Sequence, residues 1–295
     1  MFAFGDTGYK WLMQDYSFFM ILFAGSILGV ALMSAYIPFG GGLRIVKTSV
    51  PKLQSLRATL ISCQFLLAIY SIQYLPLPIF YTIAFTAPAF SAILSALILK
   101  EKVSLPNWMA IIVGLSGVFI ALQPWSFFTS GAFEYNILAL CCNFLASLLL
   151  SSSQICARLI GQKSNDSSFA TAYYPIFLVL ILSGIIYFTT DSASALSALK
   201  PIDITILCGV AVSGVLGNVF LALGFAKAPP ALAAPFHYIQ MVWAILFGTL
   251  IFHDKIEISM LIGAGLVIAS GLYLVTHKIQ SIGKRIYEEP SITQL

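Results

Sequence analysis

The sequence contains very little charge. Only 9% of its 295 residues are Asp, Glu, Lys or Arg, and 59% are hydrophobic. An ordinary soluble domain has about 25% charged residues, which cover the surface of its core. This composition excludes one large soluble domain.

Several sequence features are absent, and each absence narrows the function. The N-terminus lacks a basic region followed by an apolar core and a small-residue cleavage site, so we expect no removable secretory signal. No GxxxxGK[ST] motif is present, so ATP-driven transport would need a partner protein. The basic residues are scattered, which argues against a nucleic-acid partner. The five cysteines form no CxxC motif and lie in or beside apolar segments: Cys63, Cys141, Cys142, Cys156 and Cys208. We therefore expect them to be packing residues, and we expect neither a bound metal nor a cofactor.

Long apolar runs fill most of the chain. A bilayer core about 30 Å thick needs roughly 20 apolar residues per helix, and only structures that satisfy their own backbone hydrogen bonds survive there. The sequence therefore predicts an all-α membrane protein with ten helices, nine full and one short. The expected spans are residues 2–13, 17–39, 58–75, 77–99, 107–122, 135–157, 169–189, 204–225, 231–252 and 258–275. The first span reaches only roughly 20 Å and is the short one.

The distribution of Lys and Arg predicts the orientation, because cytoplasmic loops carry an excess of both residues. If the chain crosses the bilayer at each span, only Lys200 and Lys255 fall on one side. The other side receives Arg44, Lys47, Lys52, Arg57, Lys100, Lys102, Arg158, Lys163, Lys227, Lys278, Lys284 and Arg285. We therefore expect a multi-pass membrane protein with a cytoplasmic C-terminus.

The chain contains an internal duplication. A shift of 153 residues aligns Pro76 with Pro229 and Glu101 with Asp254. The same shift pairs Phe85 with Tyr238, Phe90 with Trp243, Leu97 with Leu250, Ile98 with Ile251, and Lys102 with Lys255. We expect repeat 1 at residues 1–123, with a shortened first helix, repeat 2 at 135–276, and a cytoplasmic tail at 277–295. Five spans per repeat would invert the second repeat, an arrangement typical of alternating-access transporters with a substrate site between the repeats.

Particular residues carry a family resemblance. In repeat 2 they are Ala234-Pro235-Phe236-His237-Tyr238, Val242-Trp243-Ala244, Gly248 and Gly271-Leu272-Tyr273. In repeat 1 they are Phe85-Thr86-Ala87-Pro88, Leu99-Lys100-Glu101-Lys102-Val103, Trp108, and Phe2, Ala3, Asp6 and Lys10. Together they resemble EamA-type transporters of the drug/metabolite transporter superfamily, in the branch of S-adenosylmethionine uptake and riboflavin transporters. The resemblance implies a ten-helix inner-membrane carrier with a central cavity. Two features depart from the family: the short first helix, and Phe23-Ala24-Gly25 where many members carry an Arg.

Ionisable residues inside spans are the first candidates for a site, because burial in the membrane is costly. Asp6 and Lys10 are four residues apart, so they share a helix face and can neutralise each other. They would either bind substrate or exchange a proton in a cavity, or form an interfacial pair. His237 follows Pro235, whose ring frees backbone groups that can line a cavity. This histidine would either face substrate or bond to a neighbouring helix.

Other polar and small residues complete the expected site and its packing. Aromatic and polar side chains suited to a planar or cationic substrate are Tyr81, Thr86, Tyr238, Gln240 and Trp243. Asn143, Gln154 and Asn218 are expected to join helices. Small residues that permit close helix approach are Gly209, Ser213 and Gly217, with Ala110 and Gly114, and Gly265 and Ala269. The last two pairs would pack either within the chain or across a homodimer.

The leading functional hypothesis is a secondary transporter of a small organic metabolite working by alternating access, with S-adenosylmethionine uptake as one candidate. A riboflavin transporter or an exporter of amino acids or other metabolites is the alternative within the family. A membrane enzyme is not expected, because Asp6 is the only carboxylate inside a span and His237, His253 and His277 lie far apart. A non-transporting structural protein is a third interpretation. The expected partners are the substrate and the lipid bilayer, and a coupling proton and a homodimer are left open.

The orientation can be tested with reporter tags fused after Arg44 and after Lys163. The distribution of basic residues predicts that both tags map to the cytoplasmic face. Tags on different faces would contradict both the span count and the inverted repeat. Alkaline phosphatase and fluorescent-protein fusions, active on opposite faces, provide the measurement.

Overall fold

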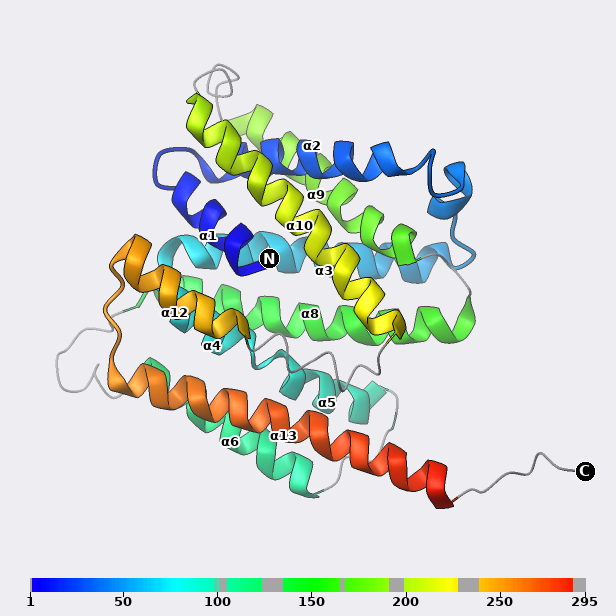
Figure 1. Ribbon diagram of the computed structural model, residues 1–295, viewed down its shortest axis with the longest axis vertical. Coiled ribbons are helices and arrows are strands. Elements are labelled where there is room, and N and C mark those ends of the chain that lie inside the picture. The colour runs from blue at the N-terminus through cyan, green and yellow to red at the C-terminus, as the bar shows by residue number, and fades with distance from the viewer. Residues whose placement is uncertain are drawn as a thin grey trace, which may run out of the picture.

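The computed structural model describes residues 2–98, 100, 105–123, 135–164, 168–190, 199–227 and 239–288. These residues form helices and no strands, which confirms the predicted all-α class. The helices pack side by side (Figure 1). They are α1 (Phe2–Leu12), α2 (Phe18–Tyr36), the short 3₁₀ helix η1 (Gly42–Val46), α3 (Pro51–Tyr74), α4 (Leu77–Ala84), α5 (Ala87–Ile98), α6 (Leu105–Leu122), α8 (Ile137–Lys163), α9 (Ser168–Thr190), α10 (Pro201–Lys227), α12 (Ile239–Phe252) and α13 (Ile258–Glu288).

Among the described residues, five stretches of helix are long and apolar enough to cross a membrane: Phe18–Tyr36, Pro51–Tyr74, Leu77–Ile98, Ile137–Gly161 and Phe169–Thr189. Shorter apolar helices cover Trp108–Leu122, Pro201–Gly217, Val242–Phe252 and Ile258–Tyr273. The count of ten spans therefore stays a prediction. Two helices extend furthest beyond their expected spans: α3 begins at Pro51, a residue tolerated in the first turn, and α13 continues to Glu288 through the start of the predicted tail.

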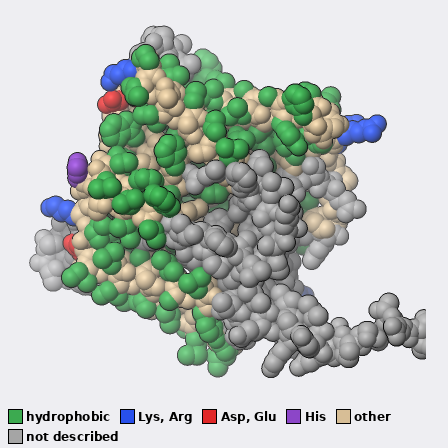
Figure 2. Space-filling view, viewed as in Figure 1, with side chains coloured by type: hydrophobic (Ala, Val, Ile, Leu, Met, Phe, Trp, Pro, Cys, Tyr) green, Lys and Arg blue, Asp and Glu red, His purple; other side chains and the backbone are tan. Residues whose placement is uncertain are grey.

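The outer surface has the character of a surface in lipid. The charged and His side chains visible on the face drawn in Figure 2 lie at the margins of the molecule, and many hydrophobic side chains lie between them on the described part of that face. On α6, Met109, Ile112 and Phe119 are all more than half exposed. A soluble monomer rarely exposes an apolar surface this continuous, so this surface fits contact with acyl chains.

The ends of the bundle agree with the predicted grouping of basic loops. Residues from the start of α3 and Lys163 at the end of α8 line one groove, so these two ends lie together. The Tyr174 hydroxyl of α9 donates to the Val46 carbonyl of η1 at 2.7 Å, which fixes the α2–α3 connection at the same end. The basic residues of these segments therefore gather at one end of the bundle.

The small-residue stripe on α10 receives the short helix α1. A Cβ added to Gly5 of α1 would lie 3.1 Å from the Ser213 hydroxyl oxygen, and one added to Gly217 would lie 3.1 Å from the Phe2 ring. Gly209 is similarly close to Phe4. The prediction that this stripe admits another helix is confirmed. Packing against α10 buries one face of α1, including Leu12.

The helix α6 packs against α13 inside the chain, through small residues on both helices. A Cβ added to Gly117 would lie 2.7 Å from the Gly263 carbonyl oxygen, and one added to Gly114 would lie 2.5 Å from the Ser270 hydroxyl oxygen. Gly265 has nothing within 4 Å of such a Cβ. The two spans left open by the sequence therefore meet in one chain, through Gly114 and Gly263 rather than Gly265.

The helix pairings follow a two-fold pattern. The helix α1 packs on α10 as α8 packs on α3, and α2 packs on α10 as α9 packs on α3. The helix α2 also packs on α9, and α6 on α13. If α1, α2, α3 and α6 correspond to α8, α9, α10 and α13, each of these pairings maps onto another or onto itself. An inverted repeat produces this pattern, which supports the predicted duplication. The repeat boundaries stay a prediction.

The fourth predicted span, 77–99, is not one continuous helix. It is broken at Phe85 and Thr86 into α4 and α5. Pro88 lies in the first turn of α5, and its missing N–H cannot bond the Ala84 carbonyl four residues earlier. The predicted span is present as Leu77–Ile98, but the turn inside it was not predicted, because the proline acts on the turn before it.

The α6–α13 contact predicts a test of stability. Gly117→Ala places a methyl group against the Gly263 backbone, so we expect a loss of about 1–3 kcal/mol by overpacking. Gly265→Ala is the matched control, since its methyl meets open space and alanine favours a helix over glycine by roughly 0.5–1 kcal/mol. Thermal unfolding in detergent measures both. Equal unfolding temperatures for the two variants would contradict the packing.

Candidate functional site

The break between α4 and α5 is supported by polar side chains on one face of α8. These residues are spaced three or four apart, so they form a line along the helix. They donate to carbonyls of α4 and α5 in three bonds: Asn143 Nδ2 to Phe80 O at 2.9 Å, Ser147 Oγ to Ile83 O at 3.3 Å, and Ser151 Oγ to Ala87 O at 2.7 Å. A fourth bond runs from Ser91 Oγ to Gln154 Oε1 at 2.8 Å. The predicted helix-joining role of Asn143 and Gln154 is thereby confirmed, while the side chain of Asn218 lies outside the described residues.

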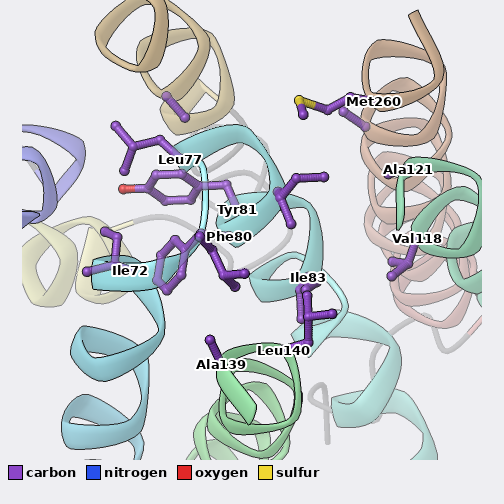
Figure 3. Close-up of a cluster of buried hydrophobic side chains, with 14 of the residues drawn as sticks. Ile72, Leu77, Phe80, Tyr81, Ile83, Val118, Ala121, Ala139, Leu140 and Met260 are labelled. Carbon is purple, nitrogen blue, oxygen red and sulfur yellow. The ribbon is translucent and has the colours of Figure 1, made fainter. Parts of the chain in front are cut away.

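This support positions Tyr81, which α4 carries one residue after Phe80. The Tyr81 side chain is 3% exposed, and its ring lies 5.2 Å from the Phe80 ring and 5.7 Å from the Phe85 ring. Figure 3 shows the ring among Leu77 and Phe80, with the hydroxyl at the edge of the hydrophobic cluster. The aromatic body is fixed by packing, and the polar tip is presented to α1.

The Tyr81 hydroxyl donates to Asp6 Oδ2 at 2.5 Å. Asp6 lies near the middle of α1, whose neighbouring residues Gly5 and Thr7 are buried against the bundle. A hydrogen bond to a carboxylate is short and strong compared with one between neutral groups. The structure therefore brings together two predicted site residues from separate helices.

Lys10 lies one turn beyond Asp6 and has different partners. Its Nζ donates to the Leu75 carbonyl at 2.8 Å and lies 3.7 Å from Asp254 Oδ2 and 4.7 Å from the centre of the Phe252 ring. The sequence suggested that Asp6 and Lys10 neutralise each other. In the structure Lys10 is paired with Asp254, and Asp6 with Tyr81, because other helices offer each side chain a closer partner.

The carboxylate of Asp254 is held by the end of α12. His253 has φ of 53°, and the Asp254 N–H donates to the Gly248 carbonyl at 2.9 Å, which closes the helix in a left-handed turn. A Cβ added to Gly248 would lie 3.0 Å from Asp254 Oδ2, so glycine leaves room for the carboxylate to fold back. The same oxygen accepts the Leu77 N–H at 3.1 Å.

The other predicted site residues have varied positions. Thr86 donates to the Ile83 carbonyl at 2.7 Å and borders a small cavity with Phe85 and Ser270. Gln240 is half-buried at the start of α12. Trp243 is 45% exposed and stacks on Phe247 of the same helix, so it lies on the outer surface. His237 and Tyr238 lie outside the described residues.

Sequence reasoning missed Asp254 as a member of the site. It falls just after an apolar span, where a carboxylate is normally read as an exposed loop residue. The signal was its alignment with Glu101 across the duplication, since both acidic residues follow equivalent helices. The left-handed residue before Asp254 turns the carboxylate back into the bundle.

Comparison with known proteins now decides the family. Residues 1–123 and 137–276 match the EamA-like transporter family. The chain belongs to this family. A crystal structure of another protein superposes with a TM-score of 0.63 over 94% of this chain and 97% of that chain, at 12% sequence identity. At this identity the likeness shows the fold alone.

Curated relatives in this family are transporters. An S-adenosylmethionine uptake transporter of Rickettsia conorii is 23% identical, with 83% of this chain and 78% of that protein covered. A riboflavin transporter of Brucella anthropi is 24% identical over 79% of this chain and 80% of its own length. An uncharacterized transporter of Helicobacter pylori strain J99 is 23% identical over 70% of this chain and 67% of its own. The EamA chain is a multi-pass membrane protein of a transporter family.

The line of polar residues on α8 predicts a stability effect. Asn143→Leu removes the donor to the buried Phe80 carbonyl, so we expect a loss of about 1–3 kcal/mol in the free energy of unfolding. Ser152→Ala on the same helix is the control, because its exposed hydroxyl bonds only to the Leu148 carbonyl of its own helix. Thermal unfolding in detergent compares the two. A control as destabilised as Asn143→Leu would show that the α8–α4 bond is not the cause.

Proposed function

We propose that this EamA protein is a secondary transporter that moves a small organic metabolite across the bacterial inner membrane by alternating access. S-adenosylmethionine uptake is the substrate assignment we favour. The observation that carries the proposal is the Asp6–Tyr81 bond between α1 and α4, within an apolar helical bundle. An ionisable group within a membrane bundle marks a substrate or ion path by default, because its burial is costly.

The chemistry of the pair suits a cationic substrate with a planar ring. S-adenosylmethionine carries a sulfonium cation, an amino-acid group and an adenine ring. The Asp6 carboxylate would attract the cation, and the rings of Tyr81 and Phe85 offer faces for stacking or for cation–π contact. Lys10 is held by Asp254, so the basic residue of the same helix face is engaged elsewhere.

Two alternatives within the family use the same site differently. Riboflavin is the first, favoured by the relative of that name in Brucella anthropi, and an amino acid or other metabolite moving outward is the second. Riboflavin carries no positive charge, so its transport would depend on the aromatic rings more than on Asp6. A coupling proton would bind the same Asp6 carboxylate. An enzyme is less well supported, since the family and the named relatives are transporters.

Uptake by a strain unable to make S-adenosylmethionine tests the proposal. Expression of this protein should give saturable uptake of the labelled compound, and Asp6→Asn should reduce it about 10- to 100-fold, the loss of a charge-assisted contact of about 1.5–3 kcal/mol. His237→Ala should also weaken uptake, from the position of this residue after Pro235. Asp15→Asn is the matched control, because Asp15 is an exposed carboxylate paired with Lys200.

Competition with unlabelled riboflavin distinguishes the alternatives. Riboflavin should compete weakly, and should not rescue a riboflavin-requiring strain in an Asp6-dependent manner. If riboflavin rescues the strain equally well with the parent protein and with Asp6→Asn, riboflavin would replace S-adenosylmethionine as the assigned substrate. Uptake equal in the parent and Asp6→Asn proteins would remove Asp6 from the site.

A further inference from the structure

The Lys10–Asp254 contact joins three parts of the chain at one end of the bundle. Lys10 lies in the last turns of α1, and Asp254 follows the end of α12. Between them is the α3–α4 turn, whose Leu75 carbonyl binds Lys10 and whose Leu77 N–H binds Asp254. The contact therefore connects helices of both predicted repeats.

A second lysine–aspartate pair at the same end shows what is unusual about this one. Lys200 and Asp15 lie 3.5 Å apart, with side chains 65% and 63% exposed. The side chains of Lys10 and Asp254 are only 10% and 13% exposed. Exposed pairs contribute little, whereas a buried charge that loses its partner is strongly unfavourable. Of these two pairs, the buried one contributes more to holding this end of the bundle closed.

We propose that Lys10 and Asp254 form a gate, and that Lys10 exchanges Asp254 for Asp6 when this end of the bundle opens. The proposal rests on the transport function proposed above, since only a transporter needs to open here. The partner exchange answers a physical question: where the lysine charge goes when α1 separates from α12.

Asp6 is suited to receive Lys10. The two residues are four apart on α1, and an acidic residue four positions before a lysine is the favourable order on a helix. In the closed state the Asp6 carboxylate is bonded to the neutral Tyr81 hydroxyl. Asp254 lies between the exposed residues His253 and Lys255, so opening would hydrate its carboxylate. Neither charge is then left buried without compensation.

The exchange links the gate to the site. A cation bound to Asp6 would compete with Lys10 for the same carboxylate. Lys10 would then stay paired with Asp254. The gate at this end would therefore stay closed while the site holds a cationic substrate and is open at the opposite end of the bundle. Release of the substrate would free Asp6 to accept Lys10.

A buried reporter cysteine on α1 tests the gate. Ala3 is 3% exposed and lies seven residues before Lys10, on the face that carries Asp6. We would introduce Ala3→Cys after replacing the five native cysteines by serine, and measure its reaction with a water-soluble maleimide in nanodiscs. Lys10→Met and Asp254→Asn should each raise the labelling rate at least tenfold. Lys200→Met, which breaks the exposed pair, should leave the rate unchanged.

An increase in labelling has to be distinguished from misfolding of the two gate variants. Asp254→Asn keeps a side-chain oxygen that can accept the Leu77 N–H, so the turn is retained while the charge is lost. Size-exclusion profiles and thermal unfolding identify folded protein. Labelling at the parental rate in both folded variants would overturn the gate.

Asp6→Asn tests the exchange of partners. With Lys10 present it should slow labelling, because the open state loses the second partner of the lysine. In the Lys10→Met background it should have no effect, and an equal effect in both backgrounds would overturn the exchange. The labelling rate reports the conformation of the protein in the absence of substrate. The gate can therefore be tested even if the uptake experiment fails.

Discussion

The hydrogen bond from Asn143 to the Phe80 carbonyl is the interaction on which the rest of the site depends. A helix broken inside a membrane leaves backbone groups that lipid cannot satisfy. The helix α8 donates from one face to carbonyls on both sides of the break, through Asn143, Ser147 and Ser151. Because α8 holds the break, α4 can carry Tyr81 as a short, separate element directed at α1. A continuous apolar helix at this position would have no such requirement.

The polar groups of the site are few and mutually satisfied. Asp6 has the Tyr81 hydroxyl, Lys10 has a carboxylate, a carbonyl and an aromatic ring, and Asp254 has a backbone N–H and a lysine. The hydrocarbon core of the bilayer explains this pattern, since each unpaired polar group there costs several kcal/mol. The short helix α1 carries both ionisable residues, and its packing on the small residues of α10 keeps them inside the bundle.

Much of the fold could be predicted from the sequence because the bilayer imposes a simple rule on composition. Apolar runs gave the helices to within a few residues in most cases, and the stripe of Gly209, Ser213 and Gly217 gave a real helix contact. The break at Phe85 was missed, because Pro88 acts on the preceding turn and its effect depends on donors from α8, far away in the chain. The actual partners of Asp6 and Lys10 were missed for a related reason. Sequence spacing reports neighbours on one helix, whereas Tyr81 and Asp254 come from other helices.

The contact between α6 and α13 has a mechanical consequence. Under the two-fold correspondence each of these helices is the counterpart of the other, so their interface maps onto itself, as does that of α2 with α9. When two inverted repeats exchange their conformations, the contacts of such an interface are the same before and after the exchange. The interface can therefore stay closely packed throughout. Under the alternating access proposed above, the near-touching backbones of Gly117 and Gly263 would act as a pivot about which the other helices rock.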